Sequence, residues 1–354
     1  MKHFLRRCIF YARNYEGGMT VKKLLAFGLS LLLLLSLVGC GATKSGATGA
    51  TSTATGEKKA IKIGIVQIVE HPALDAARQG FLETLKENGY EEGKNLTVDY
   101  QNAQGDQSVL QSIAQKFSSA KLDLVLAIAT PSAQAMASAS KDIPILITAV
   151  TDPVEAKLVN SMDKPGKNVT GTTDMNPLKE QFALMKQLVP SVKKVGVIYN
   201  AGEVNSQVQV AMAKKVAADL GLTIVEATVT TSADVLQASQ SLVGKVDTIY
   251  VPTDNMVVSA AQSVVQVANK NKIPIISGES SVVDKGALAT IGINYKKLGK
   301  QTGEMALRVF KGEKPQDMPI ESQKEFDTVL NKATITLLGL TVPDDVLKKA
   351  TFAK

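Results

Sequence analysis

The sequence has little of the residues that build metal sites and disulfide frameworks. Its 354 residues contain no tryptophan, two cysteines and two histidines. Cys8 and Cys40 are too few for a zinc ribbon or a disulfide framework. His3 lies at the very start, so a Ser-His-Asp triad in the body of the chain would have to use His71. We therefore expect no metal site and no cofactor.

An excess of one charge is also missing from most of the chain. The formal net charge is +7, but residues 1–39 hold six of the 40 basic residues and one of the 33 acidic residues. The 34 basic and 32 acidic residues that remain leave a charge of +2. This balance gives no reason to expect a nucleic-acid partner. At roughly 150 residues per domain, the length suggests about two folded units.

One long apolar run, residues 24–38, follows the pair Lys22-Lys23. At about 15 residues it is shorter than the roughly 20 that a membrane-spanning helix needs. It ends in Leu-Val-Gly-Cys at Cys40, which resembles a bacterial lipobox. The resemblance predicts cleavage before Cys40, lipidation of that cysteine and anchoring to the outer face of the cell membrane. The alternative is a signal anchor with an incidental cysteine.

The start of the chain has two candidates. Met19 and the residues after it form a normal signal-peptide start by themselves, so we hypothesise that Met19 is the true start. Residues 1–39 are then leader and signal peptide. Residues 40–59 follow as a lipidated cysteine and a flexible tether rich in Gly, Ala, Thr and Ser.

From residue 61 onward, short apolar strands alternate with amphipathic helices. The nearly continuous apolar run at 123–129 is typical of a parallel strand buried on both faces. The pattern then repeats about 130 residues later. The matching segments are 62–68 with 194–200, 123–130 with 247–254, and 143–146 with 273–276. We predict an α/β fold of two Rossmann-like lobes with parallel sheets, joined by crossover hinge segments.

The predicted lobes span residues 60–172 and 173–286. The remaining segment, 287–354, is shared between them and contains an expected strand at 287–294 and an expected helix at 298–311. Ligands of such sheets bind beyond the carboxyl ends of the strands. Two lobes facing each other form a cleft that can close on a ligand.

Hydroxyl groups follow two predicted strands of the first half. Thr130 can cap the next helix and Pro131 suits its first position. The helix N-terminus with the Ser132 hydroxyl is suited to a carboxylate, although a plain helix cap is the alternative. Thr151 ends the next strand and is a further ligand candidate. Asp152 resembles the start of a capping box and is interpreted as structural.

In the second half, Asp254 takes the position that Thr130 has in the first. A carboxylate at a strand end suits an ammonium group. The alternative is that Asp254 caps the helix from Met256, and both roles can coexist. Further candidates for the cleft edge are His71, Glu203, Asn205, Asn255 and Glu279. His71 could stack on a ligand or serve as an ordinary loop or cap residue.

These positions put donors, Ser132 and Thr151, on one lobe and the carboxylate of Asp254 on the other. The arrangement complements a zwitterion, so it favours an α-amino acid. A sugar site would favour stacking on tryptophan, which this chain lacks.

Six short motifs between residues 60 and 340 occur together in order. They are Glu-His-Pro-Ala-Leu-Asp at 70–75, Ala-Thr-Pro-Ser-Ala at 129–133, Thr-Asp-Pro-Val at 151–154, Glu-Val-Asn-Ser at 203–206, Pro-Thr-Asp-Asn at 252–255 and Tyr-Lys-Lys-Leu-Gly at 295–299. With them the chain resembles the bacterial ABC-transporter substrate-binding lipoproteins of the tryptophan/tyrosine type, which have the type I periplasmic-binding-protein fold.

The resemblance implies that the protein captures a small solute, closes on it and docks as a monomer on a membrane permease driven by an ATPase. It favours tryptophan, tyrosine or phenylalanine as the solute. Amino-acid binders of this fold hold the carboxylate with first-lobe hydroxyls and the ammonium with a second-lobe acid. Ser132, Thr151 and Asp254 match those positions.

An enzyme and a sensor component are the two alternative classes of function. An enzyme is not expected, because the chain has no G-x-G-x-x-G after its first strand, no Walker lysine loop and no G-x-S-x-G elbow. A sensor component would use the same site with a different partner. Within transport, a sugar, a nucleoside or a branched-chain amino acid are the alternative cargoes.

Overall fold

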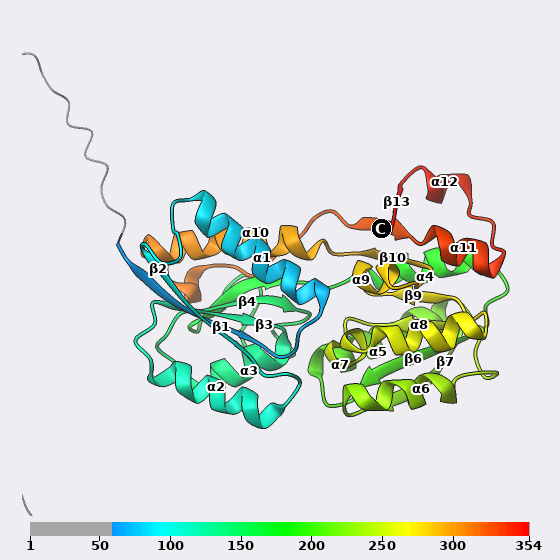
Figure 1. Cartoon of the computed structure of the whole chain (residues 1–354), viewed down its shortest axis with the longest axis horizontal. Helices are drawn as coiled ribbons and strands as arrows, with labels where there is room; N and C mark the ends of the chain where they lie inside the picture. Colours follow the sequence, from blue (N-terminus) through cyan, green and yellow to red (C-terminus); the bar gives the residue numbers. More distant parts are fainter. Residues whose placement is uncertain (1–58, 354) are drawn as a thin grey trace, which may run out of the picture. The chain divides into compact units, whose positions relative to one another are not determined.

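The computed structural model describes residues 59–353 (Figure 1). By its internal contacts, Gly56–Lys354 is one compact unit. The predicted signal peptide, the lipidation of Cys40 and nearly all of the tether lie outside the described residues. Among the described residues, no helix is both long enough and apolar enough to cross a membrane.

The first sheet has six strands in the order β11-β5-β4-β3-β1-β2, and all neighbours run parallel. Its strands are β1 (Ile61–Gln67), β2 (Leu96–Asn102), β3 (Leu124–Ile128), β4 (Ile145–Val150), β5 (Val169–Thr173) and β11 (Glu321–Ser322). Its helices are α1 (Pro72–Glu87), α2 (Gln107–Ser119), α3 (Thr130–Ala139) and α10 (Tyr295–Phe310). Figure 1 shows α1 and α10 on one face of this sheet and α2 and α3 on the other. This sheet with these helices is called the first lobe.

The second sheet has seven strands in the order β13-β12-β10-β9-β8-β6-β7, and only the β10–β12 pair is antiparallel. Its strands are β6 (Lys194–Asn200), β7 (Thr223–Val229), β8 (Thr248–Val251), β9 (Ile275–Ser277), β10 (Ala289–Gly292), β12 (Asp327–Leu330) and β13 (Ala350–Phe352). Its helices are α4 (Leu178–Leu188), α5 (Val204–Asp219), α6 (Val235–Ser241), α7 (Asn255–Ser259), α8 (Ala261–Lys270), α9 (Ser280–Asp284), α11 (Lys332–Leu338) and α12 (Asp344–Leu347). This sheet with these helices is called the second lobe. Two 3-10 turns, Ser232–Asp234 and Pro315–Asp317, complete the set.

The predicted repeat is visible in the strand order. The first sheet contains β4-β3-β1-β2 and the second contains β9-β8-β6-β7 in the same arrangement. Every residue of β3 is buried, as the apolar run at 123–129 indicates. The α/β fold of two parallel-dominated sheets is therefore confirmed.

Two local predictions differ from the structure. The helix expected from residue 298 begins three residues earlier, at Tyr295, because Asn294 caps it through Lys297 N–H. The capping-box interpretation of Asp152 predicts the start of a helix, and this is wrong because no helix follows Asp152. Its side chain does accept from Val154 and Glu155 N–H, but the chain forms only a turn there, which Lys157 closes with a φ of +59°.

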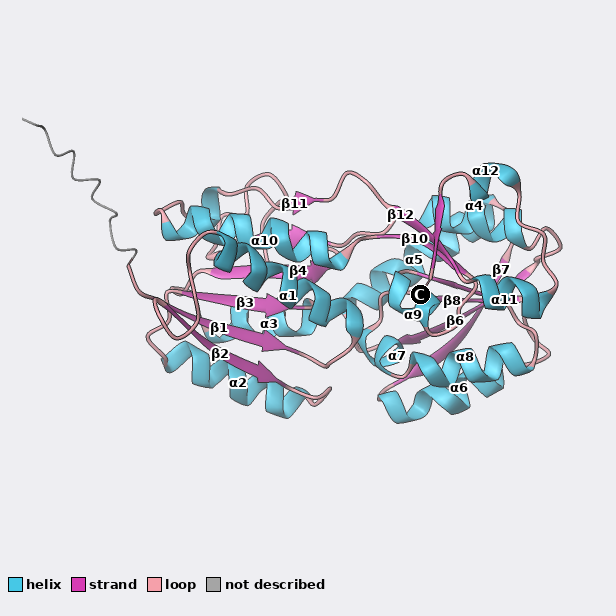
Figure 2. Ribbon diagram, turned by 45° about the horizontal axis from the view of Figure 1, so that its top comes forward, coloured by secondary structure: helices cyan, strands magenta, loops and turns pink. Residues whose placement is uncertain are grey.

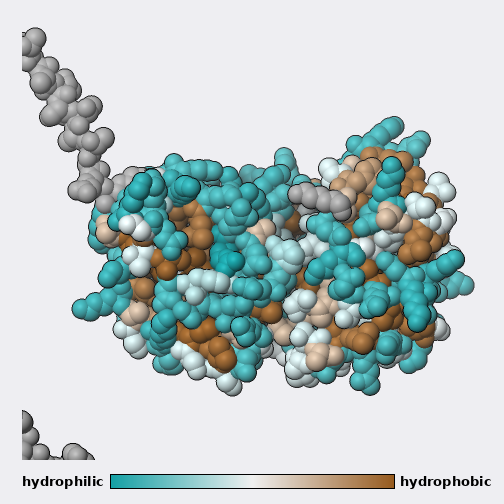
Figure 3. Space-filling model, in the orientation of Figure 1, coloured by the Kyte–Doolittle hydropathy of each residue, from teal (hydrophilic) through white to brown (hydrophobic). Residues whose placement is uncertain are grey.

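The core of each lobe lies against its sheet. One apolar cluster fills the first lobe, and two clusters cover the two faces of the second sheet. Hydrophilic side chains cover most of the face in Figure 3, with apolar patches between them. Among the large apolar side chains that stay exposed, Leu337, Leu347 and Phe352 belong to the C-terminal elements α11, α12 and β13.

Within the described residues, the chain passes between the sheets three times. The crossovers are residues 174–177 after β5, 293–294 after β10, and 323–326 after β11. Figure 2 shows the last of these as a long loop between β11 and β12. Between the last two crossovers the chain returns to the first lobe, where it forms α10 and β11.

Helix α10 packs directly along α1 because small residues line the contact. A Cβ on Gly299 would lie 1.9 Å from the carbonyl oxygen of Ala77, and a Cβ on Gly303 would lie 2.7 Å from Cβ of Thr84. Since Ala77 pairs with Gly299 and Thr84 with Gly303, the two helices run parallel. The backbones touch as closely as glycine allows.

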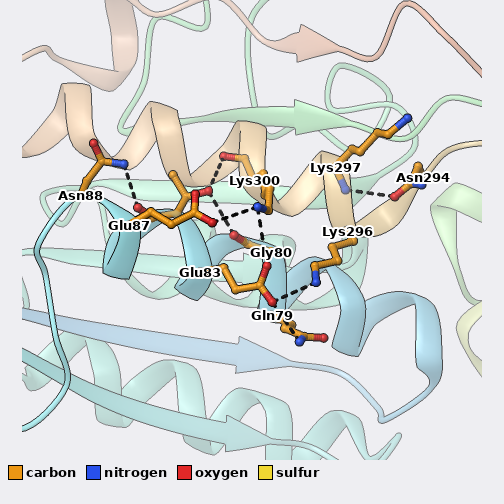
Figure 4. Close-up of polar contacts among 10 residues, drawn as sticks. Gln79, Gly80, Glu83, Glu87, Asn88, Asn294, Lys296, Lys297 and Lys300 are labelled. Atoms are coloured by element: carbon orange, nitrogen blue, oxygen red, sulfur yellow. Dashed lines mark hydrogen bonds and ion pairs between the residues drawn. The ribbon is translucent and has the colours of Figure 1, made fainter.

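Ion pairs flank this contact (Figure 4). Lys296 Nζ lies 2.9 Å from the Glu83 carboxylate, and Lys300 Nζ lies 3.1 Å from that of Glu87. All four side chains are partly exposed, so the pairs add orientation more than stability. The glycine contact is the main determinant of how α10 docks.

Gly299→Ala should lower the free energy of unfolding by about 1–3 kcal/mol, because the new methyl group overpacks the contact. In an exposed helix position the same change would raise stability by about 1 kcal/mol through helix propensity. Glu304→Ala, at an exposed position of the same helix, is the control and should change little. Urea denaturation of the three proteins measures the difference, and a stabilised Gly299→Ala protein would contradict the close contact.

Candidate functional site

The residues predicted beyond the strand ends are buried together with the core. Each of them is less than one-tenth exposed, and His71, at 7%, is the most exposed. The set is His71, Thr130, Ser132, Thr151, Glu203, Asn205, Asp254, Asn255 and Glu279. Because buried polar groups require partners, the partners that each side chain has decide what it can do.

Hydrogen-bond donors gather at the start of α3 in the first lobe. Thr130 is the first residue of α3 and not its cap, which corrects the prediction; the cap position is held by Ala129, whose side chain cannot bond. The hydroxyls of Thr130 and Ser132 are both buried and without a partner. The first amides of a helix have no intrahelical acceptor either, and the helix dipole favours an anion beside them.

The backbone before this helix is strained. Ala129, after β3, has a φ of +77°, and Ala149, near the end of β4, has a φ of +56°. The β4–β5 pairing also shifts register between Ile147 and Val150. Alanine in the left-handed region costs about 1–3 kcal/mol, and such residues cluster at functional sites. Ala129 directly precedes the predicted ligand residue Thr130, and Ala149 lies two residues before the predicted ligand residue Thr151.

In the second lobe, Asp254 caps α7. Its Oδ1 accepts from Val257 N–H at 2.9 Å, and its Oδ2 accepts from Asn200 N–H and the Ser206 hydroxyl, each at 2.6 Å. The capping alternative is thus confirmed, and burial raises the pKa of the carboxyl. Contact of Asp254 with a ligand ammonium stays a prediction.

Glu203 lies beside Asp254, and one of its carboxyl oxygens has no hydrogen-bond partner. Its Oε2 accepts from the amide groups of Asn205 and Asn255, while its Oε1 is buried without a partner. Burial and the neighbouring Asp254 carboxylate raise the pKa of Glu203 to about 8. Asn205 Oδ1 is likewise unpartnered. None of the ion pairs among the described residues includes Glu203 or Asp254.

Glu279 has a different role from these acceptors. It caps α9, and its carboxylate accepts from the N–H and the hydroxyl of Ser281 at 2.7 and 2.6 Å. Its oxygens are therefore engaged within the second lobe. Its predicted contact with ligand stays a prediction.

Asp174, in the crossover after β5, is a buried residue of this region that was not predicted from the sequence. This carboxyl is fully buried, which raises its pKa, and its Oδ2 accepts from the Tyr295 hydroxyl at 2.6 Å. The Thr151 hydroxyl approaches the same group, but Oδ1 has no hydrogen bond of normal geometry. The strand-end rule would have found Asp174, had it been applied to the short Val-Thr-Gly-Thr-Thr strand that precedes it.

Two further side chains were missed and join the lobes. Gln209 Nε2 donates to Thr253 Oγ1 at 2.6 Å in its own lobe and to Thr151 Oγ1 at 3.4 Å in the other. Met256, of α7, packs into the apolar cluster of the first lobe. The strand ends of the two lobes are thus in contact, as the sequence predicts.

Three surface cavities lie away from the predicted site. Cavities of about 660, 590 and 360 Å³ lie on the first lobe, and residues such as Lys157, Tyr100 and Asp123 line them. None includes a residue of the predicted site. Within the described part of the chain, no group of three or more His, Cys, Asp or Glu side chains could hold a metal ion.

Asp254→Ala should destabilise the protein by more than about 3 kcal/mol, because it leaves three buried donors, on Asn200, Ser206 and Val257, without an acceptor at about 1–3 kcal/mol each. Asp106→Ala is the matched control: Asp106 caps α2 at the surface, where loss of a cap costs about 1 kcal/mol. Thermal and urea unfolding would show the difference. Equal effects of the two changes would mean that Asp254 is an ordinary cap.

Known proteins match this chain over most of its length. The family model described as "ABC transporter substrate binding protein" matches residues 62–354. A tyrosine-binding protein of Clostridioides difficile is 47% identical over 320 residues, which are 90% of this chain and 93% of that one. Proteins of this family are extracytoplasmic, bind a small solute and work with a membrane transporter.

Two solved structures relate the arrangement of the lobes to ligand. An ABC domain from Streptococcus pneumoniae in complex with L-Trp is 38% identical, with a TM-score of 0.81 over 84% of this chain and all of that one. The ligand-free, open structure of an adhesive substrate-binding protein from Clostridium difficile is 50% identical, but has a TM-score of only 0.64 over 83% of this chain and 99% of that one. The open relative is the more similar of the two in sequence, but the ligand-bound relative is the more similar in structure. The structure therefore resembles the ligand-bound relative. By sequence and fold, the chain belongs to the family of ABC-transporter substrate-binding proteins, of the tryptophan/tyrosine type.

Proposed function

We propose that the protein binds an aromatic amino acid as a zwitterion between its lobes and delivers it to an ABC importer. One observation carries this proposal. Among the buried polar atoms without partners are the hydroxyls of Thr130 and Ser132, which can donate at the start of α3 in the first lobe, and Glu203 Oε1 and Asn205 Oδ1, which can accept in the second lobe. A ligand with a carboxylate at one end of its polar part and an ammonium at the other satisfies both sets.

The energetics favour a cation at the acceptor side. Asp174, Glu203, Asp254 and Glu279 are all fully buried, and burial raises the pKa of each carboxyl. A buried carboxylate without a cation is costly, whereas charge-assisted hydrogen bonds are strong. We assign the ammonium to Glu203 and Asp174, because Oε1 of one and Oδ1 of the other are unpartnered. Asp254 then caps α7, and its charge raises the pKa of the neighbouring Glu203.

The aromatic cargo is supported by the two relatives that carry a named ligand, tyrosine and L-Trp. The first-lobe donors fit the carboxylate that all amino acids share. A sensor role would use this same site. Binding of the loaded protein to a permease, and not to a receptor, separates the two roles.

Calorimetric titration should show that L-Tyr, L-Trp or L-Phe binds, while tyramine and 3-(4-hydroxyphenyl)propionate, which lack the carboxylate or the ammonium, bind at least a hundredfold more weakly. The crystallised relatives span the counterpart of about 84% of this chain, so residues 56–354 are a suitable fragment. The chain has no tryptophan, so the fluorescence of L-Trp reports its own binding. Equal binding of tyramine would refute the zwitterion proposal, and binding of sugars alone would refute the cargo.

Ser132→Ala and Glu203→Gln should each weaken amino-acid binding about tenfold to a hundredfold, since each removes a charge-assisted hydrogen bond of about 1.5–3 kcal/mol. Ser112→Ala is the control, because the Ser112 hydroxyl only bonds its own helix at an exposed position. Binding constants and melting temperatures of the three variants are compared. Unchanged affinity in a folded Glu203→Gln protein would remove Glu203 from the ammonium site.

The membrane anchor is part of the same proposal, with Cys40 as the lipidated residue. Cys40→Ala should release the protein from the membrane fraction or leave it unprocessed, whereas Cys8→Ala should leave it anchored. Fractionation of cells that make each variant, with mass spectrometry of the N-terminus, measures both outcomes. An anchored and processed Cys40→Ala protein would contradict lipidation at this residue.

A further inference from the structure

His71 is a buried side chain that the zwitterion site does not use. It occupies the cap position of α1, four residues after the end of β1, and makes no side-chain cap bond to the helix. It is 7% exposed, and its Nδ1 is buried without a hydrogen-bond partner. It is also the only histidine among the described residues.

The neighbours of His71 decide which ring nitrogen carries the proton. The amide nitrogen of Asn255 donates to Glu203 Oε2, so the Asn255 oxygen is left as an acceptor. The Asn255 side chain hydrogen-bonds the imidazole, and because Nδ1 has no partner this bond is made by Nε2–H. In a neutral imidazole, Nδ1 then carries a lone pair and can only accept.

The ring stays neutral at physiological pH. Burial lowers the pKa of His71 to about 3, and the positive charge of Lys285 acts in the same direction. The Asn255 bond opposes this shift but does not overcome it. Nδ1 therefore remains a bare acceptor over the whole range in which the protein works.

The backbone groups of an amino acid do not supply the missing donor. The carboxylate cannot donate, and the ammonium is attracted to the buried carboxyls of Glu203 and Asp174. The bond from His71 through Asn255 to Glu203 places the imidazole at the same meeting point of the lobes as the ammonium site. A donor on the ligand side chain is what remains.

We infer that His71 Nδ1 accepts a hydrogen bond from the ring of the bound amino acid, either the phenol O–H of tyrosine or the indole N–H of tryptophan. Phenylalanine has no such donor and would leave Nδ1 buried and unpaired. His71 is thus a specificity residue that selects tyrosine or tryptophan over phenylalanine. The inference rests on the proposed function, since it concerns the side chain of the same ligand.

Sites built to hydrogen-bond a ligand group discriminate strongly against the analogue that lacks it. We expect the better of L-Tyr and L-Trp to bind at least about tenfold more tightly than L-Phe, in line with one unsatisfied buried acceptor. His71→Leu, which has a similar size and no acceptor, should bring the two affinities within about twofold, because it removes both the bond to the preferred ligand and the cost of an unpaired Nδ1 beside L-Phe. His71→Asn, whose oxygen can take the place of Nδ1, should keep the preference.

A second measurement needs no variant. Residues 56–354 contain one histidine, so the ¹⁵N spectrum of the selectively labelled fragment reports His71 alone. The Nδ1 resonance should move upfield when the preferred ligand binds, as for a nitrogen that accepts a hydrogen bond, and should stay with L-Phe. This test holds even if His71→Leu fails to fold.

The outcomes separate the two proposals. L-Phe bound as tightly as L-Tyr and L-Trp, with the same Nδ1 resonance for all three, would overturn the role of His71 and leave the aromatic-amino-acid site in place. Absence of binding for all three would overturn the proposed function itself. A tenfold preference that disappears in His71→Leu and survives in His71→Asn would establish the inference.

Discussion

The contact between α1 and α10 is the constraint on which the site depends. Glycines let the two backbones touch, and the helices run parallel, so their N-termini lie at the same end. His71 precedes one helix and Tyr295 begins the other. The Tyr295 hydroxyl in turn hydrogen-bonds Asp174, which lies in the crossover after β5. Thr302 of α10 hydrogen-bonds Thr172 in β5 itself. One close helix contact therefore fixes two crossovers and brings an imidazole and a carboxyl to the boundary of the lobes.

Each lobe also presents different polar groups at the ends of its strands, although the two sheets are built in the same way. In parallel sheets, the strand ends gather at one edge, where helix N-termini also begin. The first lobe presents hydroxyls and free amides there, and the second presents carboxyl and amide oxygens, held by Asp254 and its hydrogen bonds to β6 and α7. Neither lobe alone can satisfy its own polar groups. The specificity of the site comes from this division between the two.

The sequence was sufficient for the sheets and for placing the nine candidate residues after the strand ends, because hydrophobic periodicity and strand ends are local signals. It was insufficient for the bonding of each side chain. Thr130 fails to cap because Ala129 takes an unusual φ, which no residue pattern indicates. Asp254 and Asn200 are 54 residues apart, and Asp174 and Tyr295 are 121 apart. Such pairs depend on strand order and crossover geometry, which only the folded chain defines.

The unpaired atoms also affect how readily the lobes close when no solute is bound. When the lobes meet without a solute, Ser132 Oγ and Glu203 Oε1 lose water and gain no partner, at about 1–3 kcal/mol for each. Because a solute removes that cost, it favours the meeting of the lobes by the same amount. The empty molecule therefore closes less readily than the loaded one.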